Sequence, residues 1–216
     1  MQKDQFPQVL EYYHQRFIFQ KLCYGTLCDL LYMGEFHTMN TEFTIQQLDT
    51  NHRDAYYALR LEGLEMHPQA FATSAEEWRA APQSKIDALL LASEKNIEPI
   101  LGVFTSNSEL VGTATLIPET RQAVRHKASL AALYVPSAWR HKGLGTQLIT
   151  EALNRARRLP DLTFIRLVVD SENPDAVRLF EKLGFHFYGR EPQARRVGDR
   201  YYDQSYMLCF LHDQVS

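Results

Sequence analysis

The stretch that decides the fold reads Ser129-Leu-Ala-Ala-Leu-Tyr-Val135, then Pro-Ser-Ala-Trp, then Arg140-His-Lys-Gly-Leu-Gly145. Its first part has the apolar character of a strand, and a helical pattern of apolar residues follows it. Two glycines two positions apart let the backbone turn tightly, and a helix N-terminus adds unpaired N–H groups and a positive dipole end. The junction is therefore interpreted as a binding site for a phosphate group. Plain turn glycines at such a junction are the alternative, which this stretch alone leaves open.

The helical pattern after the glycines is amphipathic, with apolar positions at Leu144, Leu148, Ile149, Ala152, Leu153 and Ala156. Periodicity predicts further helices over residues 51–66, 74–93 and 174–183, the second of them split at Pro82 and capped by Ser74. Strands are predicted over residues 43–48, 100–104, 110–117, 127–135, 163–169, 185–188 and 202–210. Short turns join the strands between 100 and 135, so these are expected to pair antiparallel. The chain is predicted to form a single α/β core around a mixed sheet.

Composition limits the function classes. With 216 residues, 45% of them hydrophobic, the chain has room for one domain of ordinary size and an appendage. A formal charge of −3 argues against a nucleic-acid binder. Two local basic clusters, Arg121, Arg125, His126 and Lys127, and Arg195, Arg196 and Arg200, are interpreted as solvated loops, with selection of an acidic substrate as the alternative.

The chain has three cysteines, Cys23, Cys28 and Cys209. Their number does not suit a disulfide framework, so a reducing, cytoplasmic compartment is predicted. They also do not form a zinc site, so no metal is predicted. No apolar stretch reaches the length of a membrane span, and no membrane partner is expected.

Two segments carry a combined pattern. The first runs from Leu133 to Leu153 and contains Arg140-His-Lys-Gly-Leu-Gly145, and the second is Asn173-Pro-Asp-Ala-Val-Arg-Leu-Phe-Glu-Lys-Leu-Gly-Phe185. Together they resemble the GNAT superfamily of acetyl-CoA-dependent N-acetyltransferases, whose R/Q-x-x-G-x-G/A loop is matched by residues 140–145. The resemblance covers residues 43 to 210. It implies a mixed, mostly antiparallel sheet of six to seven strands, with splayed central strands flanked by helices.

The resemblance also implies acetyl-CoA as the cofactor and assigns its site. Pyrophosphate is expected on the amides of the glycine loop, and the pantetheine arm in the gap between 133–135 and 168–170. One N–H near 133–135 is expected to polarise the thioester carbonyl. The cofactor-binding residues predicted in this way are Leu133, Tyr134, Val135, Arg140, His141, Lys142, Gly143, Leu144, Gly145, Thr146, Asn173 and Phe180.

Acetyl transfer to an amine also needs a proton acceptor, because an alkylamine with a pKa near 10.4 is protonated at neutral pH. The predicted catalytic residues are Tyr134, Glu65, His126 and Tyr206; Glu62 and His67 are further candidates for the base. Many members of the family place a proton-donating tyrosine where this chain has Phe180. Its hydroxyl is missing here, which leaves the departing thiolate to water or to Tyr188, Tyr202 or Tyr206.

The expected function is transfer of an acetyl group from acetyl-CoA to a primary amine of a small molecule, an amino acid or a peptide N-terminus. In this family the acceptor cleft is lined by the stretches corresponding to residues 61–78 and 191–202. A non-catalytic acyl-CoA-binding sensor is the alternative, and a monomer or homodimer is expected. A dinucleotide-binding fold is disfavoured because the glycines do not form G-x-G-x-x-G.

Residues 1–39 are rich in aromatic side chains and lie outside the resemblance. They are interpreted as an N-terminal extension to an N-acetyltransferase domain at residues 40–216. Translation starting at Met39 and a helical arm that packs in a dimer are the two hypotheses for the extension.

Overall fold

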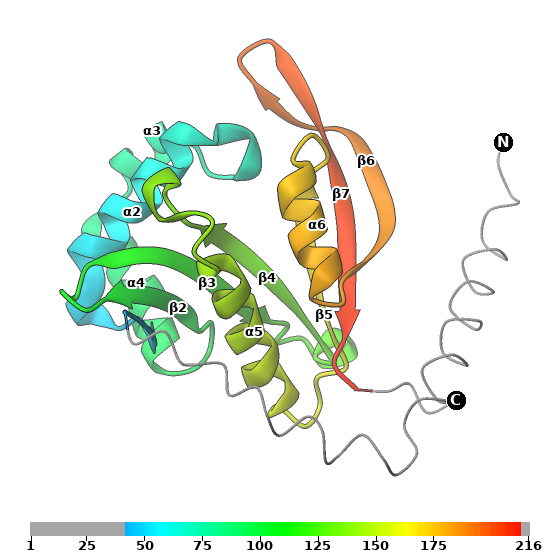
Figure 1. Ribbon diagram of the computed structural model, residues 1–216, viewed down its shortest axis with the longest axis horizontal. Coiled ribbons are helices and arrows are strands. Elements are labelled where there is room, and N and C mark those ends of the chain that lie inside the picture. The colour runs from blue at the N-terminus through cyan, green and yellow to red at the C-terminus, as the bar shows by residue number, and fades with distance from the viewer. Residues whose placement is uncertain (1–41, 213–216) are drawn as a thin grey trace, which may run out of the picture. The chain divides into compact units, whose positions relative to one another are not determined.

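The computed structural model describes residues 42–212, and the predictions for residues 1–39 and for Cys23 and Cys28 lie outside them. The described part is built on one seven-stranded sheet with the strand order β1-β2-β3-β4-β5-β7-β6 (Figure 1). The strands are β1 (Phe43–Gln47), β2 (Ile100–Thr105), β3 (Leu110–Pro118), β4 (Lys127–Tyr134), β5 (Phe164–Asp170), β6 (His186–Val197) and β7 (Arg200–Phe210). β4 and β5 are parallel, and every other neighbouring pair is antiparallel. The predicted fold class, a mixed and mostly antiparallel sheet, is confirmed.

Helices cover both faces of this sheet. They are α2 (Arg53–Met66), α3 (Ala75–Ala80), α4 (Gln83–Glu94), α5 (Leu144–Arg157) and α6 (Pro174–Lys182). Short 3-10 turns accompany them: η1 (Thr50–His52), η2 (Pro68–Ala70), η3 (Gln122–Val124) and η4 (Ser137–Trp139). The predicted break at Pro82 separates α3 from α4, and Ser74 caps α3 by accepting a hydrogen bond from the Glu77 amide, as predicted.

Two cores hold the layers together, one on each face of the sheet. On the first face α5 packs with all six of its predicted apolar positions buried, and Phe180 of α6 lies in the same core. On the second face, α2, α3 and α4 cover the sheet with Tyr56, Trp78 and Leu90 among their buried side chains. Burial of these apolar faces explains why the helices form where the sequence shows amphipathic periodicity.

The central strands separate, as predicted. β4 pairs with β5 only over Lys127–Ser129 against Phe164–Arg166, and beyond these residues the register has no partners between the two strands. β4 also slips by one residue against β3 between Ala131 and Tyr134, where Ala132 has a φ of 54°. Such a bulge bends a strand, and it lies where β4 leaves β5. Figure 1 shows the β2–β4 half of the sheet diverging from the β5–β7 half.

The β6 strand corrects one prediction. It extends from His186 to Val197, whereas a strand over 185–188 was predicted. Gly189 and Pro192 disrupt the apolar alternation beyond residue 188, but β6 is the last strand of the sheet, and edge strands tolerate both residues. Its pairing with β7 shifts register between Glu191 and Arg195.

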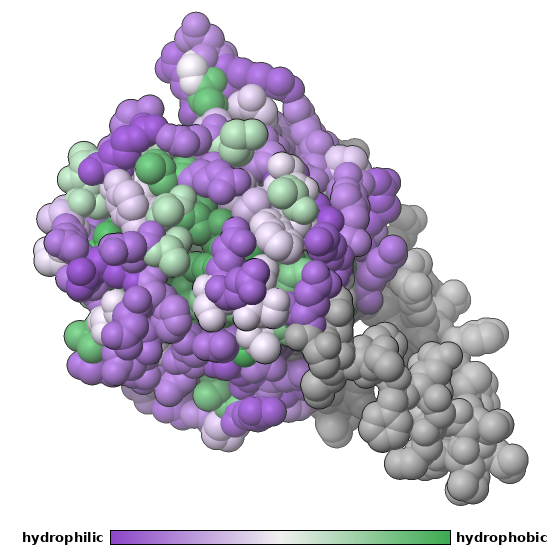
Figure 2. Space-filling view, turned by 60° about the vertical axis from the view of Figure 1, so that its left-hand side comes forward, coloured by the Kyte–Doolittle hydropathy of each residue, from purple (hydrophilic) through white to green (hydrophobic). Residues whose placement is uncertain are grey.

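The surface of the described part is mixed. Figure 2 shows apolar residues gathered in a hollow in the middle of one face, with hydrophilic residues around them. Within residues 42–212, no helix is long and apolar enough to cross a bilayer.

Candidate active site

A cleft of about 600 Å³ opens where β4 and β5 separate. Ala131 and Ala132 line it from β4, and Leu167 and Val168 from β5. Residues of α2, α3 and the 70–73 segment form the opposite wall, and η2 reaches across to contact β5 and β6. The cleft therefore lies beside backbone groups that have no ladder partner between the two strands.

The predicted phosphate-binding site lies at the N-terminus of α5. Gly143 caps the helix with a φ of 78°, and its carbonyl accepts the Gln147 amide at 3.0 Å. The amides of Leu144, Gly145 and Thr146 have no acceptor within the described chain, and no side chain caps the helix. Three amides converging at the positive end of a helix dipole form a site for an anion.

The two glycines of this loop have different roles. Gly143 occupies the left-handed region, which disfavours any side chain, although a Cβ there would meet nothing closer than Gln147 at 4.0 Å. Gly145 does not need a positive φ. A Cβ on Gly145 would approach Leu179 of α6 at 3.3 Å, so this glycine allows α5 and α6 to pack closely.

The basic side chains of the loop have partners within the chain. Nε of Arg140 donates to the Val135 carbonyl at 2.9 Å, and its Nη2 lies 2.7 Å from Nε2 of His67. Nζ of Lys142 lies 4.7 Å from the centre of the Trp139 ring. Both residues are exposed, as is His141 with its φ of 62°.

The second predicted segment is also placed by local contacts. Asn173 caps α6, its Oδ1 accepting the Ala176 amide at 3.1 Å. Phe180 is only 6% exposed and packs edge-on against Phe185, with ring centres 5.7 Å apart. Its ring thus belongs to the core shared by α5 and α6.

Tyr134 ends β4 at the separation of the strands and is 6% exposed. Its ring packs against α2 at Gly63. A Cβ added to Gly63 would lie 3.0 Å from the ring, so only glycine leaves room for it there. The hydroxyl donates to Oε1 of Glu62 at 2.9 Å. Burial, followed by the hydrogen bond and negative charge of Glu62, raises the pKa of Tyr134 to about 12. Tyr134 is therefore a protonated donor at neutral pH rather than a base.

His67 completes this group at the end of α2. Its ring centre lies 6.1 Å from that of Tyr134, and its Nε2 faces the Arg140 guanidinium. Burial, and then the charge of Arg140, lower the pKa of His67 below its usual value. Because a guanidinium only donates, Nε2 accepts this bond and the proton of the neutral ring is on Nδ1.

Three residues predicted as catalytic lie apart from this group. The exposed Glu65 pairs with Arg79. His126 precedes β4 and packs against Phe164, at the opposite end of the strand from Tyr134 and roughly 25 Å away by strand length. Tyr206 of β7 lines the cleft, but its hydroxyl donates to Glu191, which is the main reason for its raised pKa.

Arg60 also lines the cleft, although it is not among the residues predicted for the site. It is a charged residue one helical turn from the apolar Tyr56 and Leu64, on the buried side of α2. A charge placed within an apolar helix face is the signal that identifies such a residue from sequence.

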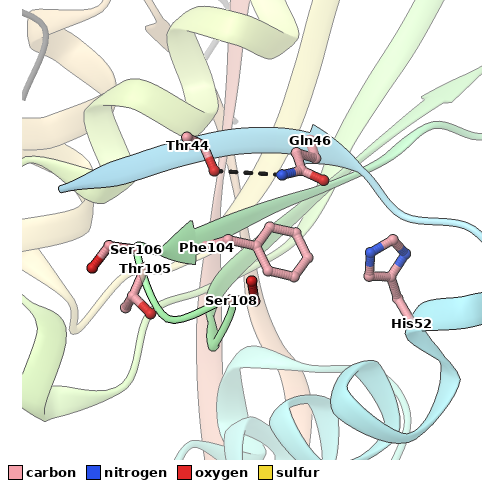
Figure 3. Close-up of a pocket in the computed structure, with 7 residues that line it drawn as sticks. All are labelled: Thr44, Gln46, His52, Phe104, Thr105, Ser106 and Ser108. Carbon is pink, nitrogen blue, oxygen red and sulfur yellow. Dashed lines mark hydrogen bonds between the residues drawn. The ribbon is translucent and has the colours of Figure 1, made fainter. Parts of the chain in front are cut away.

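A smaller pocket of about 350 Å³ lies elsewhere, at the β1 edge of the sheet (Figure 3). His52 and Phe104 face each other there with ring centres 5.2 Å apart, and Gln46 donates to Thr44. None of the residues predicted to bind the cofactor lines this pocket, and none of them is among the residues that line the larger cleft. Residues 42–212 contain no cluster of three or more His, Cys, Asp or Glu side chains suited to a metal ion.

Comparison with known proteins adds family information to this geometry. Residues 53–185 match the model of the acetyltransferase (GNAT) family. A methionine sulfoximine/methionine sulfone acetyltransferase of Pseudomonas aeruginosa is 30% identical over 118 residues. That match covers 52% of this chain and 65% of the relative, slightly less than two thirds of its length.

Solved structures share the fold. A GNAT-family acetyltransferase of Streptococcus pneumoniae superposes with a TM-score of 0.70 at 21% identity, covering 79% of this chain and all of that one. A putative acetyltransferase of Salmonella typhimurium was solved with its cofactor acetyl-CoA. It superposes with a TM-score of 0.69 at 22% identity, covering 81% of this chain and 96% of that one.

Proposed function

The chain belongs to the GNAT acetyltransferase family, and from that premise we propose that it transfers an acetyl group from acetyl-CoA to the primary amine of a small molecule. Family membership confirms the predicted resemblance and, with it, the enzyme class, an acyl-CoA-dependent N-acyltransferase, and acetyl-CoA as the cofactor that the family uses. The acceptor and the residues that act on it are the proposed part.

The observation that carries the proposal is the position of the β4–β5 separation next to the open N-terminus of α5. Unpaired backbone groups in the gap suit the amides of a pantetheine arm, and the free amides of Leu144, Gly145 and Thr146 suit a pyrophosphate. The residues present thus fit acetyl-CoA, which supplies an acetyl thioester to the site. An N–H of the bulged end of β4, near Leu133–Val135, is proposed to stabilise the oxyanion.

Glu62 is the proposed general base. Its carboxylate accepts the Tyr134 hydroxyl at 2.9 Å and so is held beside the end of β4. An ammonium group with a pKa near 10.4 must lose a proton before it attacks, and a carboxylate accepts that proton through water. Tyr134 then acts by positioning Glu62, since its own proton is tightly held.

Departure of the CoA thiolate depends less on acid–base catalysis than deprotonation of the amine does. A thiol of ordinary pKa, about 8.5, leaves as a weakly basic anion. Phe180 offers no hydroxyl, and the Tyr206 hydroxyl is engaged by Glu191. We therefore propose that the thiolate takes its proton from water.

The acceptor is proposed to occupy the cleft beside β4 and β5. About 600 Å³ is within the range of small-molecule sites. By their printed names, the curated relatives act on modified amino acids, which supports a small acceptor over a protein tail. A cytoplasmic setting and a monomer or homodimer remain predictions.

Thiol release from acetyl-CoA on a panel of amines, amino acids and peptides tests the proposal. Turnover with at least one small primary amine, together with an N-acetyl product detected by mass spectrometry, is expected. Tight binding of CoA without thiol release on any acceptor would contradict it and favour the sensor alternative.

A further inference from the structure

Arg60 lacks a partner in the acceptor cleft. Its Nη1 is the one side-chain nitrogen or oxygen in residues 42–212 that is buried without a hydrogen bond. The guanidinium stacks 4.6 Å from the centre of the Phe71 ring and 5.9 Å from that of Trp78. Aromatic faces hold the group in place but accept none of its in-plane hydrogen bonds.

An unpaired guanidinium is costly to bury. Burial lowers the pKa of Arg60, yet arginine remains charged at neutral pH, so the charge persists in the cleft. Within residues 42–212 no carboxylate pairs with Arg60, and Tyr56, its neighbour one turn back on α2, is a neutral phenol whose pKa is raised by burial. A bound ligand is therefore the available source of compensation.

The other arginines around the cleft are already compensated. Arg166 donates to Glu119 at 2.7 Å and to Ser129 at 3.1 Å. Arg195 interacts with the negative charges of Asp170 and Glu191, and the Gln204 amide oxygen accepts its hydrogen bond when that amide is turned to suit its neighbours. At the turn between β6 and β7, Arg196 pairs with Asp199 and Arg200 pairs with Glu172. Among the cleft-lining residues the only carboxylate is that of Glu98.

We infer that the acceptor is an amino acid or related amino-carboxylate, whose carboxylate is bound by Arg60 while its amine faces the gap between β4 and β5. This inference rests on the proposed function. The planar guanidinium edge matches a carboxylate with two parallel hydrogen bonds.

The test compares matched acceptors. The best amino acid from the thiol-release panel is assayed beside its carboxamide and its decarboxylated amine. Wild type is expected to lose roughly 10- to 100-fold in kcat/KM without the carboxylate, the range of a lost charged hydrogen bond. Arg60→Gln should lose the same factor on the amino acid and little on the carboxamide, with Arg60→Lys in between.

Two controls separate the role of Arg60 from general damage. Arg166→Gln removes a compensated arginine of the same cleft and should retain the preference for the carboxylate. CoA affinity of Arg60→Gln should match wild type. Its melting temperature should stay close to that of wild type, because the lost stacking on Phe71 and Trp78 is offset by removal of a buried, unpaired charge.

Each failure has its own signature. Amines acetylated equally well with and without a carboxylate, or phosphoethanolamine preferred over every amino acid, would overturn this inference and leave the proposed function standing. Absence of thiol release on every acceptor would overturn both.

Discussion

The Tyr134 hydroxyl donates a hydrogen bond of 2.9 Å to Oε1 of Glu62, joining the end of β4 to α2 across 72 positions of the chain. The bond connects β4, which borders the proposed cofactor gap, to α2, which borders the proposed acceptor cleft. It orients the carboxylate that we propose as the general base. The roles proposed for its two partners, Glu62 as the base and Tyr134 as the positioning residue, can therefore be tested separately.

Glu62→Gln should lower kcat at pH 7.5 by roughly 100-fold or more, the contribution of a general base. Tyr134→Phe should cost about tenfold, because the carboxylate remains but loses its orienting bond. The Glu62→Gln deficit should shrink as the pH approaches the pKa of the acceptor amine, which then loses its proton unaided. Steady-state rates from pH 7 to 10 check this, and a deficit independent of pH would rule out the base.

Alkaline stability should report on the same contact. The folded-state pKa of Tyr134 is about 12 against an ordinary 10.0, so the protonated phenol is favoured by folding. Its contribution is fully present below pH 10 and is lost as the pH rises towards 12. Urea unfolding at pH 9 and pH 11 should show a larger loss in wild type than in Tyr134→Phe. Equal losses would show that Tyr134 titrates normally.

Gly63→Ala should be harmful, although alanine favours helices. A Cβ at Gly63 would lie 3.0 Å from Cγ of Tyr134, closer than packed carbon atoms normally come. Displacing the ring should outweigh the gain of about 1 kcal/mol that alanine brings to an open helix position. Melting temperature and kcat should both fall. Gly189→Ala, where a Cβ meets nothing within 4 Å, is the control, and a more stable Gly63→Ala enzyme would contradict the packing.

His67 should destabilise the fold when it is protonated. Burial and the Arg140 charge lower its pKa, so the neutral ring is favoured in the folded state. This stability is present above the ordinary histidine pKa of about 6.5 and is lost as the pH falls through the lower folded-state value. Unfolding curves between pH 7.5 and 5 should fall more steeply for wild type than for His67→Gln. An NMR titration that places the His67 pKa above 6.5 would refute this.

Local patterns in the chain predict the α5 helix and the glycine turn before it well. The amphipathic residues of α5 and the glycine loop before it are contiguous, so periodicity and turn chemistry suffice to place them. The two glycines looked equivalent, yet Gly143 is required for its backbone conformation and Gly145 for close packing on Leu179. Only tertiary contacts distinguish these roles.

The acceptor half is harder to predict because its residues come from distant parts of the chain. Glu62 and Glu65 are alike in sequence, but one meets Tyr134 and the other Arg79. His126 lies at the wrong end of β4 to join Tyr134, although both flank one predicted strand. Arg60 is recognisable in the sequence as a charge on an apolar helix face. Only the structure shows that its buried Nη1 has no hydrogen-bond partner within residues 42–212.

The most direct measurement of the central claim, that the N-terminus of α5 holds the pyrophosphate of acetyl-CoA, is calorimetric binding of CoA to Gly143→Asp and Gly143→Asn. The two side chains have the same shape, and asparagine tolerates the left-handed backbone of Gly143, so charge is the main difference. Gly143→Asp should bind CoA at least about tenfold more weakly than Gly143→Asn, since a carboxylate would face the pyrophosphate at short range. Pantetheine, which lacks phosphate, should bind both alike. Equal CoA affinities for the two variants would contradict the account.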